Sequence, residues 1–141
     1  MSQEDVERLR GYLERWDPKA DVEALNRGEA VDLSLIDPDV AYEDTILPDH
    51  VGETYRGFEG VLRATERWLE PFESLTVELE RIIGTGDRLV SIHRVTMKAR
   101  YSGIDLEGPL AYVWTFRDGK VIHLKSYADP GEAAEAAGLS E

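Results

Sequence analysis

The sequence of 141 residues contains no cysteine, which excludes disulfide bonds, thiolate catalysis and cysteine-ligated metals. It also has no apolar run close to the roughly 18–20 residues that a membrane-spanning helix needs. Its first residues are acidic and lack the basic-then-apolar pattern of a signal peptide. We therefore expect a cytoplasmic protein with no membrane partner.

Basic residues are scarce as well: 16 Lys and Arg stand against 29 Asp and Glu, and the formal net charge is −13. Such a field repels phosphate backbones and anionic surfaces, so no nucleic-acid partner is expected. A glycine-rich phosphate loop is missing too, because Gly84-Thr85-Gly86 precedes a predicted strand and not a helix. We predict no nucleotide cofactor and no cofactor of another kind.

A metal site is not predicted either. His50 lies in an acidic predicted loop near Asp49 and Glu53, but no second histidine is close to it in sequence. We therefore favour an exposed loop histidine over a metal ligand.

Hydrophobic residues make up 42% of the chain, enough for the core of one domain spanning residues 1–141. Apolar residues at helical spacing predict a first helix from about Ser2 to Trp16, a second over residues 20–27 and a turn or two over 29–36. The longest helix is predicted to open at Gly57. Its apolar stripe is interpreted as core rather than as a cofactor site and comprises Phe58, Val61, Leu62, Thr65, Trp68, Leu69 and Phe72.

From Val40 the apolar period changes to two, which predicts strands. A strand over 40–46 and a short one over 53–56 should pair with each other. Strands over 74–83, 88–101, 106–116 and 120–127 follow, and Asp118-Gly119 is typical of a two-residue hairpin turn. A short Ala-rich helix over 131–137 ends the pattern. The fold class is therefore α+β, with N-terminal helices packed on a curved antiparallel meander that encloses a pocket.

The alternation of charged and uncharged residues indicates which side chains face that pocket. On the strand over 88–101, Arg94 and Lys98 should point outward, so His93 and Met97 point inward. On the last strand, Ile122, Leu124 and Ser126 form the inward set. The predicted pocket residues are Trp16, Tyr42, Asp44, Trp68, His93, Met97, Leu110, Tyr112, Trp114, Leu124 and Ser126. Apolar walls with a few polar groups are typical of a small-molecule site.

Five segments resemble, in order and spacing, the SnoaL-like branch of the nuclear transport factor 2 superfamily. They are residues 35–40 (LIDPDV), 55–57 (YRG), 86–88 (GDR), 112–120 (YVWTFRDGK) and 127–130 (YADP). The resemblance implies a cone-shaped, cystatin-like α+β fold with the pocket inside the cone. It also implies a homodimer across the outer face of the sheet, where we expect Ile92, Val113, Thr115 and His123. This fold serves isomerases, cyclases, dehydratases, epoxide hydrolases and non-enzymatic binders.

Asp44 is the main candidate for chemistry. A carboxylate on a mostly apolar inward face must be paired, neutralised or functional. Together with a hydroxyl donor from Tyr42, it resembles the ketosteroid isomerase arrangement, in which an Asp base is combined with a Tyr donor. The alternative is that Asp44 lies at the mouth of the cone, hydrated or bound to a loop amide.

His93 is the third catalytic candidate. It would act as a general acid or base or hold Asp44 ionised, and the alternative is a core histidine bonded to Tyr42 or Tyr112. The Tyr, Asp and His set resembles the dehydratases. The epoxide hydrolase branch is less similar, since its partner carboxylates are missing here, and many cyclases carry an Asp where this chain has Ser126.

The sequence thus predicts a cofactor-independent protein that binds a small apolar or polyketide-like ligand. Its catalytic form would be an isomerase, dehydratase or cyclase that transfers a proton on a carbonyl substrate, with Asp44, Tyr42 and His93 at the site. The other hypothesis is a non-catalytic ligand-binding or dimeric interaction module.

Overall fold

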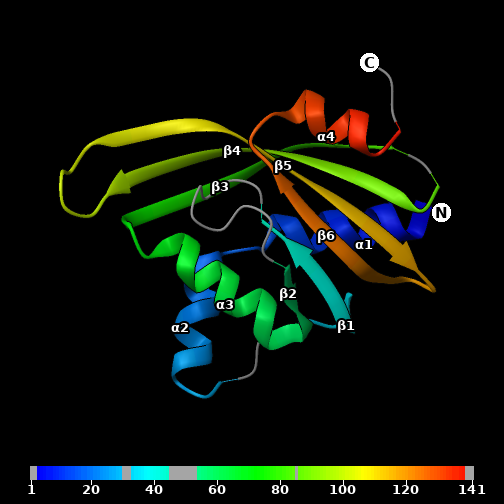
Figure 1. Cartoon of the computed structure of the whole chain (residues 1–141), viewed down its shortest axis with the longest axis horizontal. Helices are drawn as coiled ribbons and strands as arrows, with labels where there is room; N and C mark the ends of the chain where they lie inside the picture. Colours follow the sequence, from blue (N-terminus) through cyan, green and yellow to red (C-terminus); the bar gives the residue numbers. More distant parts are fainter. Residues whose placement is uncertain (1–2, 30–32, 45–53, 85, 139–141) are drawn as a thin grey trace.

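The computed structural model describes residues 3–29, 33–44, 54–84 and 86–138. Three helices lie on the concave side of a curved six-stranded sheet, and a fourth lies on its outer side (Figure 1). The elements are α1 (Gln3–Glu14), α2 (Pro18–Asn26), β1 (Ile36–Glu43), β2 (Thr54–Arg56), α3 (Gly57–Leu69), β3 (Phe72–Ile83), β4 (Arg88–Ala99), β5 (Asp105–Arg117), β6 (Lys120–Tyr127) and α4 (Pro130–Ala136). The predicted α+β fold class is confirmed.

The strand order is β2-β1-β6-β5-β4-β3, so the last strand of the meander returns beside the first strand of the chain. β1 pairs antiparallel with β2, as predicted. Its pairing with β6 is parallel, which departs from the all-antiparallel expectation. The reason is that α3 and the meander separate these two strands in sequence, and period-two patterns do not reveal the direction of such a remote neighbour.

Helix and turn boundaries follow local chemistry. Asp17 caps α2 by accepting a hydrogen bond from the Ala20 amide at 3.1 Å, and Pro18 occupies the first turn. The helix therefore begins at Pro18 rather than at Ala20. The Asp118-Gly119 hairpin turn is confirmed, with positive φ angles of 53° and 78° at its two residues.

Strand parity largely agrees with prediction. On β4, Ser91, His93 and Val95 are buried whereas Arg94 is exposed. The inward position predicted for Ile122 on β6 is wrong. A bulge pairs Thr115 with His123 and Phe116 with Val121, so Val121 takes the inward place and is fully buried.

The outer face of the sheet is covered in part by α4. Ala133 of this helix is fully buried against an apolar cluster from β4 and β5 that comprises Val90, Ile92, Ala111 and Val113. Two of the four residues expected at a dimer interface, Ile92 and Val113, are therefore buried within the chain itself. Thr115 and His123 remain partly exposed.

Some sequence predictions fall outside the described residues: the Ser2 cap, part of the turn over 29–36, the strand end at Thr45 and Ile46, the loop with His50, and Glu53. Among the residues that are described, no helix has the length and apolarity to cross a bilayer.

Candidate functional site

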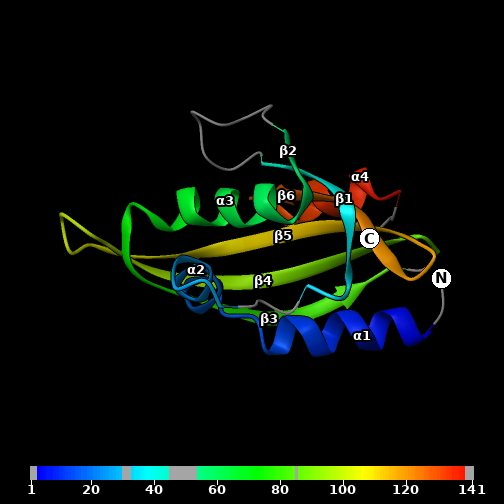
Figure 2. The same ribbon diagram turned by 90° about the horizontal axis from the view of Figure 1, so that it is seen from below.

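An apolar cavity of about 40 Å³ lies between the helices and the concave face of the sheet. Figure 2 looks toward this side, where α1 and α3 flank the strands and α2 lies near one end. Six predicted residues line the cavity: Trp16, Tyr42, Trp68, Tyr112, Trp114 and Leu124. The other predicted residues, Asp44, His93, Met97, Leu110 and Ser126, do not line it, although all but Met97 are buried.

Aromatic rings fill most of the space around the cavity. Trp16 stacks on Trp68 with ring centroids 6.3 Å apart, and meets Tyr112 edge-on at 5.8 Å. Tyr12 meets Trp114 edge-on at 6.3 Å. All three tryptophans of the chain therefore surround one cavity.

A first polar network, the Asp44 cluster, comprises Asp44, Ser126, Tyr42 and Tyr112. The Ser126 hydroxyl donates to Oδ1 of Asp44 at 3.3 Å, and both residues are buried. The Tyr42 hydroxyl is hydrogen bonded to those of Ser126 and Tyr112. Tyr42 and Tyr112 reach the cavity wall, so the network runs from a buried carboxylate to the cavity.

Both tyrosines of this cluster are held neutral. Burial raises the pKa of Tyr42, and the nearby Asp44 carboxylate raises it further. Burial also raises the pKa of Tyr112 well above its ordinary value, with Tyr42 and Asp44 adding to the shift. The two hydroxyls can therefore donate hydrogen bonds at neutral pH without losing their protons.

A second polar network, the His93 cluster, comprises His93, Ser91 and Trp114. Nε2 of His93 lies 2.8 Å from Oγ of Ser91, and Nε1 of Trp114 donates to the same oxygen at 2.8 Å. His93 is 1% exposed, and burial lowers the pKa of its imidazole to about 4. Nδ1 of His93 has no hydrogen-bond partner among the described residues.

The predicted catalytic trio is thus divided between the two clusters. Asp44 and Tyr42 belong together through Ser126, whereas the hydrogen-bond partner of His93 is Ser91. The ring of Tyr112 lies between, 5.7 Å from that of His93 and 6.5 Å from that of Tyr42.

Ser91 and Tyr12 are among the residues of this region that were not predicted as site residues. Ser91 has the same strand parity as His93, but a serine two residues from a histidine gives no sign of a bond. Tyr12 stands four residues before Trp16, and this helical spacing was the available signal, although α1 ends at Glu14 and Trp16 lies in the connector to α2.

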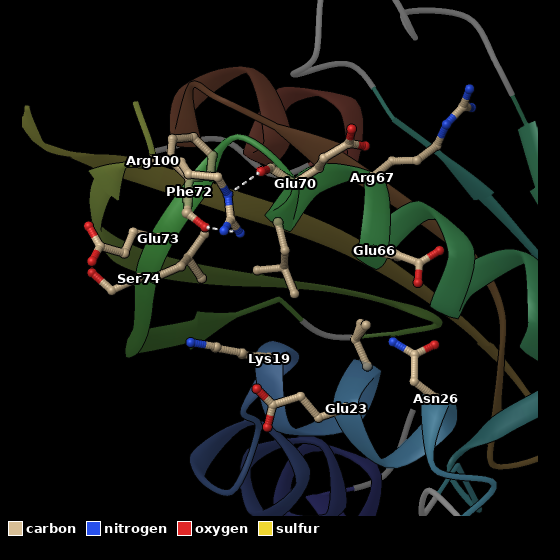
Figure 3. Close-up of a pocket in the computed structure, with 13 residues that line it drawn as sticks. Lys19, Glu23, Asn26, Glu66, Arg67, Glu70, Phe72, Glu73, Ser74 and Arg100 are labelled. Atoms are coloured by element: carbon tan, nitrogen blue, oxygen red, sulfur yellow. Dashed lines mark hydrogen bonds between the residues drawn. The ribbon is translucent and has the colours of Figure 1, made fainter. Parts of the chain in front are cut away.

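A larger groove of about 410 Å³ opens on the surface between α2, α3 and β3 (Figure 3). Lys19 and Glu23 face it from α2, opposite Glu70 and Arg100. Arg100 is used structurally, since it donates to the carbonyls of Glu70 and Phe72 at 3.1 Å each. None of the predicted site residues lines this groove.

Within the described part of the chain, no three His, Asp or Glu side chains lie close enough together to hold a metal ion. The third histidine of the chain, His123, contacts Glu43 at 2.6 Å on the outer face.

A curved sheet with helices on its concave face, enclosing an aromatic cavity, defines the class of cone-shaped α+β proteins. The sequence model of one family of this class, the SnoaL-like domain, matches residues 9–124 of this chain. The chain belongs to this family, which confirms the resemblance found in the sequence. A search of curated proteins gives no significant match.

Solved structures share the fold of this chain. A protein described as a putative SnoaL-like polyketide cyclase from Jannaschia sp. CCS1 has 18% identity and a TM-score of 0.68, over 97% of this chain and 93% of that one. A hypothetical protein with a ketosteroid isomerase-like fold from Catenulispora acidiphila has 16% identity and a TM-score of 0.63, over 99% and 96%. At such identities the likeness shows the fold alone.

Proposed function

We propose that this protein binds a small apolar or polyketide-like carbonyl compound and catalyses proton transfer on it without a cofactor. The observation that carries the proposal is the Asp44 cluster. A 5% exposed carboxylate is connected through Ser126 to the neutral hydroxyl of Tyr42, a residue that lines the cavity.

In the proposed step, Asp44 takes a proton from the carbon beside the substrate carbonyl, and the C–H electron pair moves toward the carbonyl oxygen. The Tyr42 hydroxyl donates a hydrogen bond to that oxygen as negative charge develops, with Tyr112 behind it. Asp44 then returns the proton to another carbon, as in an isomerase, or to a hydroxyl group on the neighbouring carbon that leaves as water, as in a dehydratase. A cyclase would use the same carbanion-like intermediate to form a carbon–carbon bond.

Exchange of α-protons in D₂O tests the proposal without knowledge of the natural substrate. We expect the protein to accelerate exchange in 2-tetralone, a bicyclic ketone with one aromatic ring, as followed by ¹H NMR. Asp44→Asn should reduce the accelerated rate by about 10²–10⁴-fold, the usual contribution of a general base. Tyr42→Phe should reduce it by a smaller factor.

The matched control is Glu43→Gln. Glu43 is the adjacent carboxylate on β1, but it contacts His123 on the outer face. Its removal should leave the exchange rate unchanged. Equal rates in the wild type and in Asp44→Asn would refute the catalytic proposal.

The second candidate is a non-catalytic binding module. It is favoured by the observation that Asp44 is not among the residues that line the cavity. If a panel of ketones, enones and epoxides binds without exchange or turnover, this function replaces the catalytic one.

We also propose a cytoplasmic homodimer that uses the part of the outer face that α4 leaves exposed, near Thr115 and His123. Sedimentation should give the mass of a dimer at micromolar concentration. A monomer under these conditions would refute this part of the proposal.

A further inference from the structure

The hydrogen bonds of Ser91 determine which nitrogen of His93 carries the proton. The indole N–H of Trp114 can only donate, so Oγ of Ser91 accepts it. In the described part of the chain, Nε2 of His93 is the one acceptor within reach of the Ser91 hydroxyl proton. Ser91 therefore donates to Nε2, and the neutral imidazole carries its own proton on Nδ1.

This Nδ1–H group is a buried donor with no partner in the described residues. Leaving such a group unsatisfied costs about 1–3 kcal/mol in general, so its retention calls for an explanation. A hydrogen-bond acceptor on a bound ligand would satisfy it, whereas a ligand donor would not.

Two of the rings that line the cavity also contact His93: Tyr112, whose centroid lies 5.7 Å from that of the imidazole, and Trp16. Trp16 meets His93 edge-on with centroids 6.0 Å apart, and Trp16 itself lines the cavity. Trp16 follows α1 and precedes α2, so its side chain is attached to a connector and not to a helix. The cavity of about 40 Å³ is far below the roughly 300–1,000 Å³ of typical ligand sites, and a ligand must displace a ring to enter.

We propose that His93 Nδ1–H binds an acceptor oxygen of the ligand after the ligand has displaced the Trp16 indole. β5 and β6 separate β4, which carries His93, from β1, which carries Tyr42, and the ring of Tyr112 lies between the two side chains. This oxygen is therefore distinct from the one at Tyr42. The ligand class is a compound of at least two fused rings with an oxygen acceptor at each end. The assignment of the oxygen at Tyr42 rests on the function proposed above.

Two matched probes test this inference: 6-methoxy-2-tetralone, and 6-ethyl-2-tetralone, in which a methylene replaces the ether oxygen. Calorimetric titration of the wild type should show the methoxy compound binding about fivefold more tightly, the value of one neutral hydrogen bond. His93→Leu should abolish this preference. His93→Asn should keep it, because the Asn amide places an N–H close to the position of Nδ1.

NMR of the ¹⁵N-labelled wild type adds readouts that do not depend on the folding of variants. We expect a protonated Nδ1 and an unprotonated Nε2 in the free protein, and a shift of the Nδ1–H signal with the methoxy compound only. The indole signal of Trp16 should move with both compounds. A proton on Nε2, equal affinity of the wild type for the two probes, or an undiminished preference in His93→Leu would overturn the inference.

Asp44→Asn separates this inference from the proposed function. It should lose α-proton exchange but keep the preference for the methoxy compound. If exchange is unaffected by Asp44→Asn while the preference still depends on His93, the catalytic proposal fails and the ligand contact stands.

Discussion

The two polar networks of the pocket differ in charge and in completeness. The Asp44 cluster holds a carboxylate, and each of its four members has a hydrogen-bond partner within it. The His93 cluster is neutral and has an N–H without a partner among the described residues. Both are buried at the same sheet, so burial alone does not decide what a polar group can do. The first arrangement suits proton transfer, and the second suits recognition of an acceptor.

The largest expected difference between the clusters appears on acidification. An unfolded chain protonates His93 below its ordinary pKa of 6.5, whereas the folded chain does so only near its lowered pKa of about 4. The unfolded state therefore binds more protons between these values, and the free energy of unfolding rises with pH across this window. The contribution is about 3 kcal/mol, lost progressively as the pH falls.

Urea unfolding of the wild type and His93→Asn at several pH values measures this effect. The variant should lose less stability than the wild type between pH 6.5 and pH 4, and the difference isolates His93 from the carboxylates that titrate in both proteins. Parallel pH profiles would contradict a buried, neutral His93.

Removal of the hydroxyl of Ser126 should have the next largest effect. Ser126→Ala takes a donor away from the Asp44 carboxylate in a fully buried position. We expect a loss of about 2 kcal/mol in the free energy of unfolding, since hydrogen bonds to charged groups are stronger than neutral ones. An unchanged urea midpoint would show that other partners hold the carboxylate.

Ser91→Ala is the matching change in the neutral cluster. It removes the acceptor of Trp114 and the donor to Nε2 of His93. We expect a loss of about 1–2 kcal/mol, because two hydrogen bonds are lost but both are neutral. The more specific result concerns the imidazole, whose ¹⁵N signals should show Nε2 partly protonated. A tautomer that stays wholly on Nδ1 would mean that Ser91 does not set it.

The smallest effect is expected on the outer face, where Glu43 and His123 contact each other at 2.6 Å with side chains 36% and 35% exposed. Glu43→Gln should change the free energy of unfolding by about 0.5 kcal/mol or less, because the contact lies at the partly exposed outer face and the Gln amide can still bond to His123. A loss as large as that of Ser126→Ala would mean that this pair is buried, for example in a dimer.

The sequence was sufficient to predict which side of the sheet most residues face. The period of two placed His93 and Ser126 inward, and the Asp-Gly turn located one hairpin. It was not sufficient to predict contacts that depend on how separate elements pack. Three such contacts are the packing of α4 on Ile92 and Val113, the bulge at Ile122 and the hydrogen bond of His93. Each depends on which strands or helices meet, and a local sequence pattern does not contain that information.

A structure of the complex with 6-methoxy-2-tetralone tests the central claim most directly. We predict that the rings occupy the space vacated by the Trp16 indole, with the carbonyl oxygen at the Tyr42 hydroxyl and the methoxy oxygen at Nδ1 of His93. A ligand in the groove between α2, α3 and β3, with Trp16 still stacked on Trp68, would contradict the account.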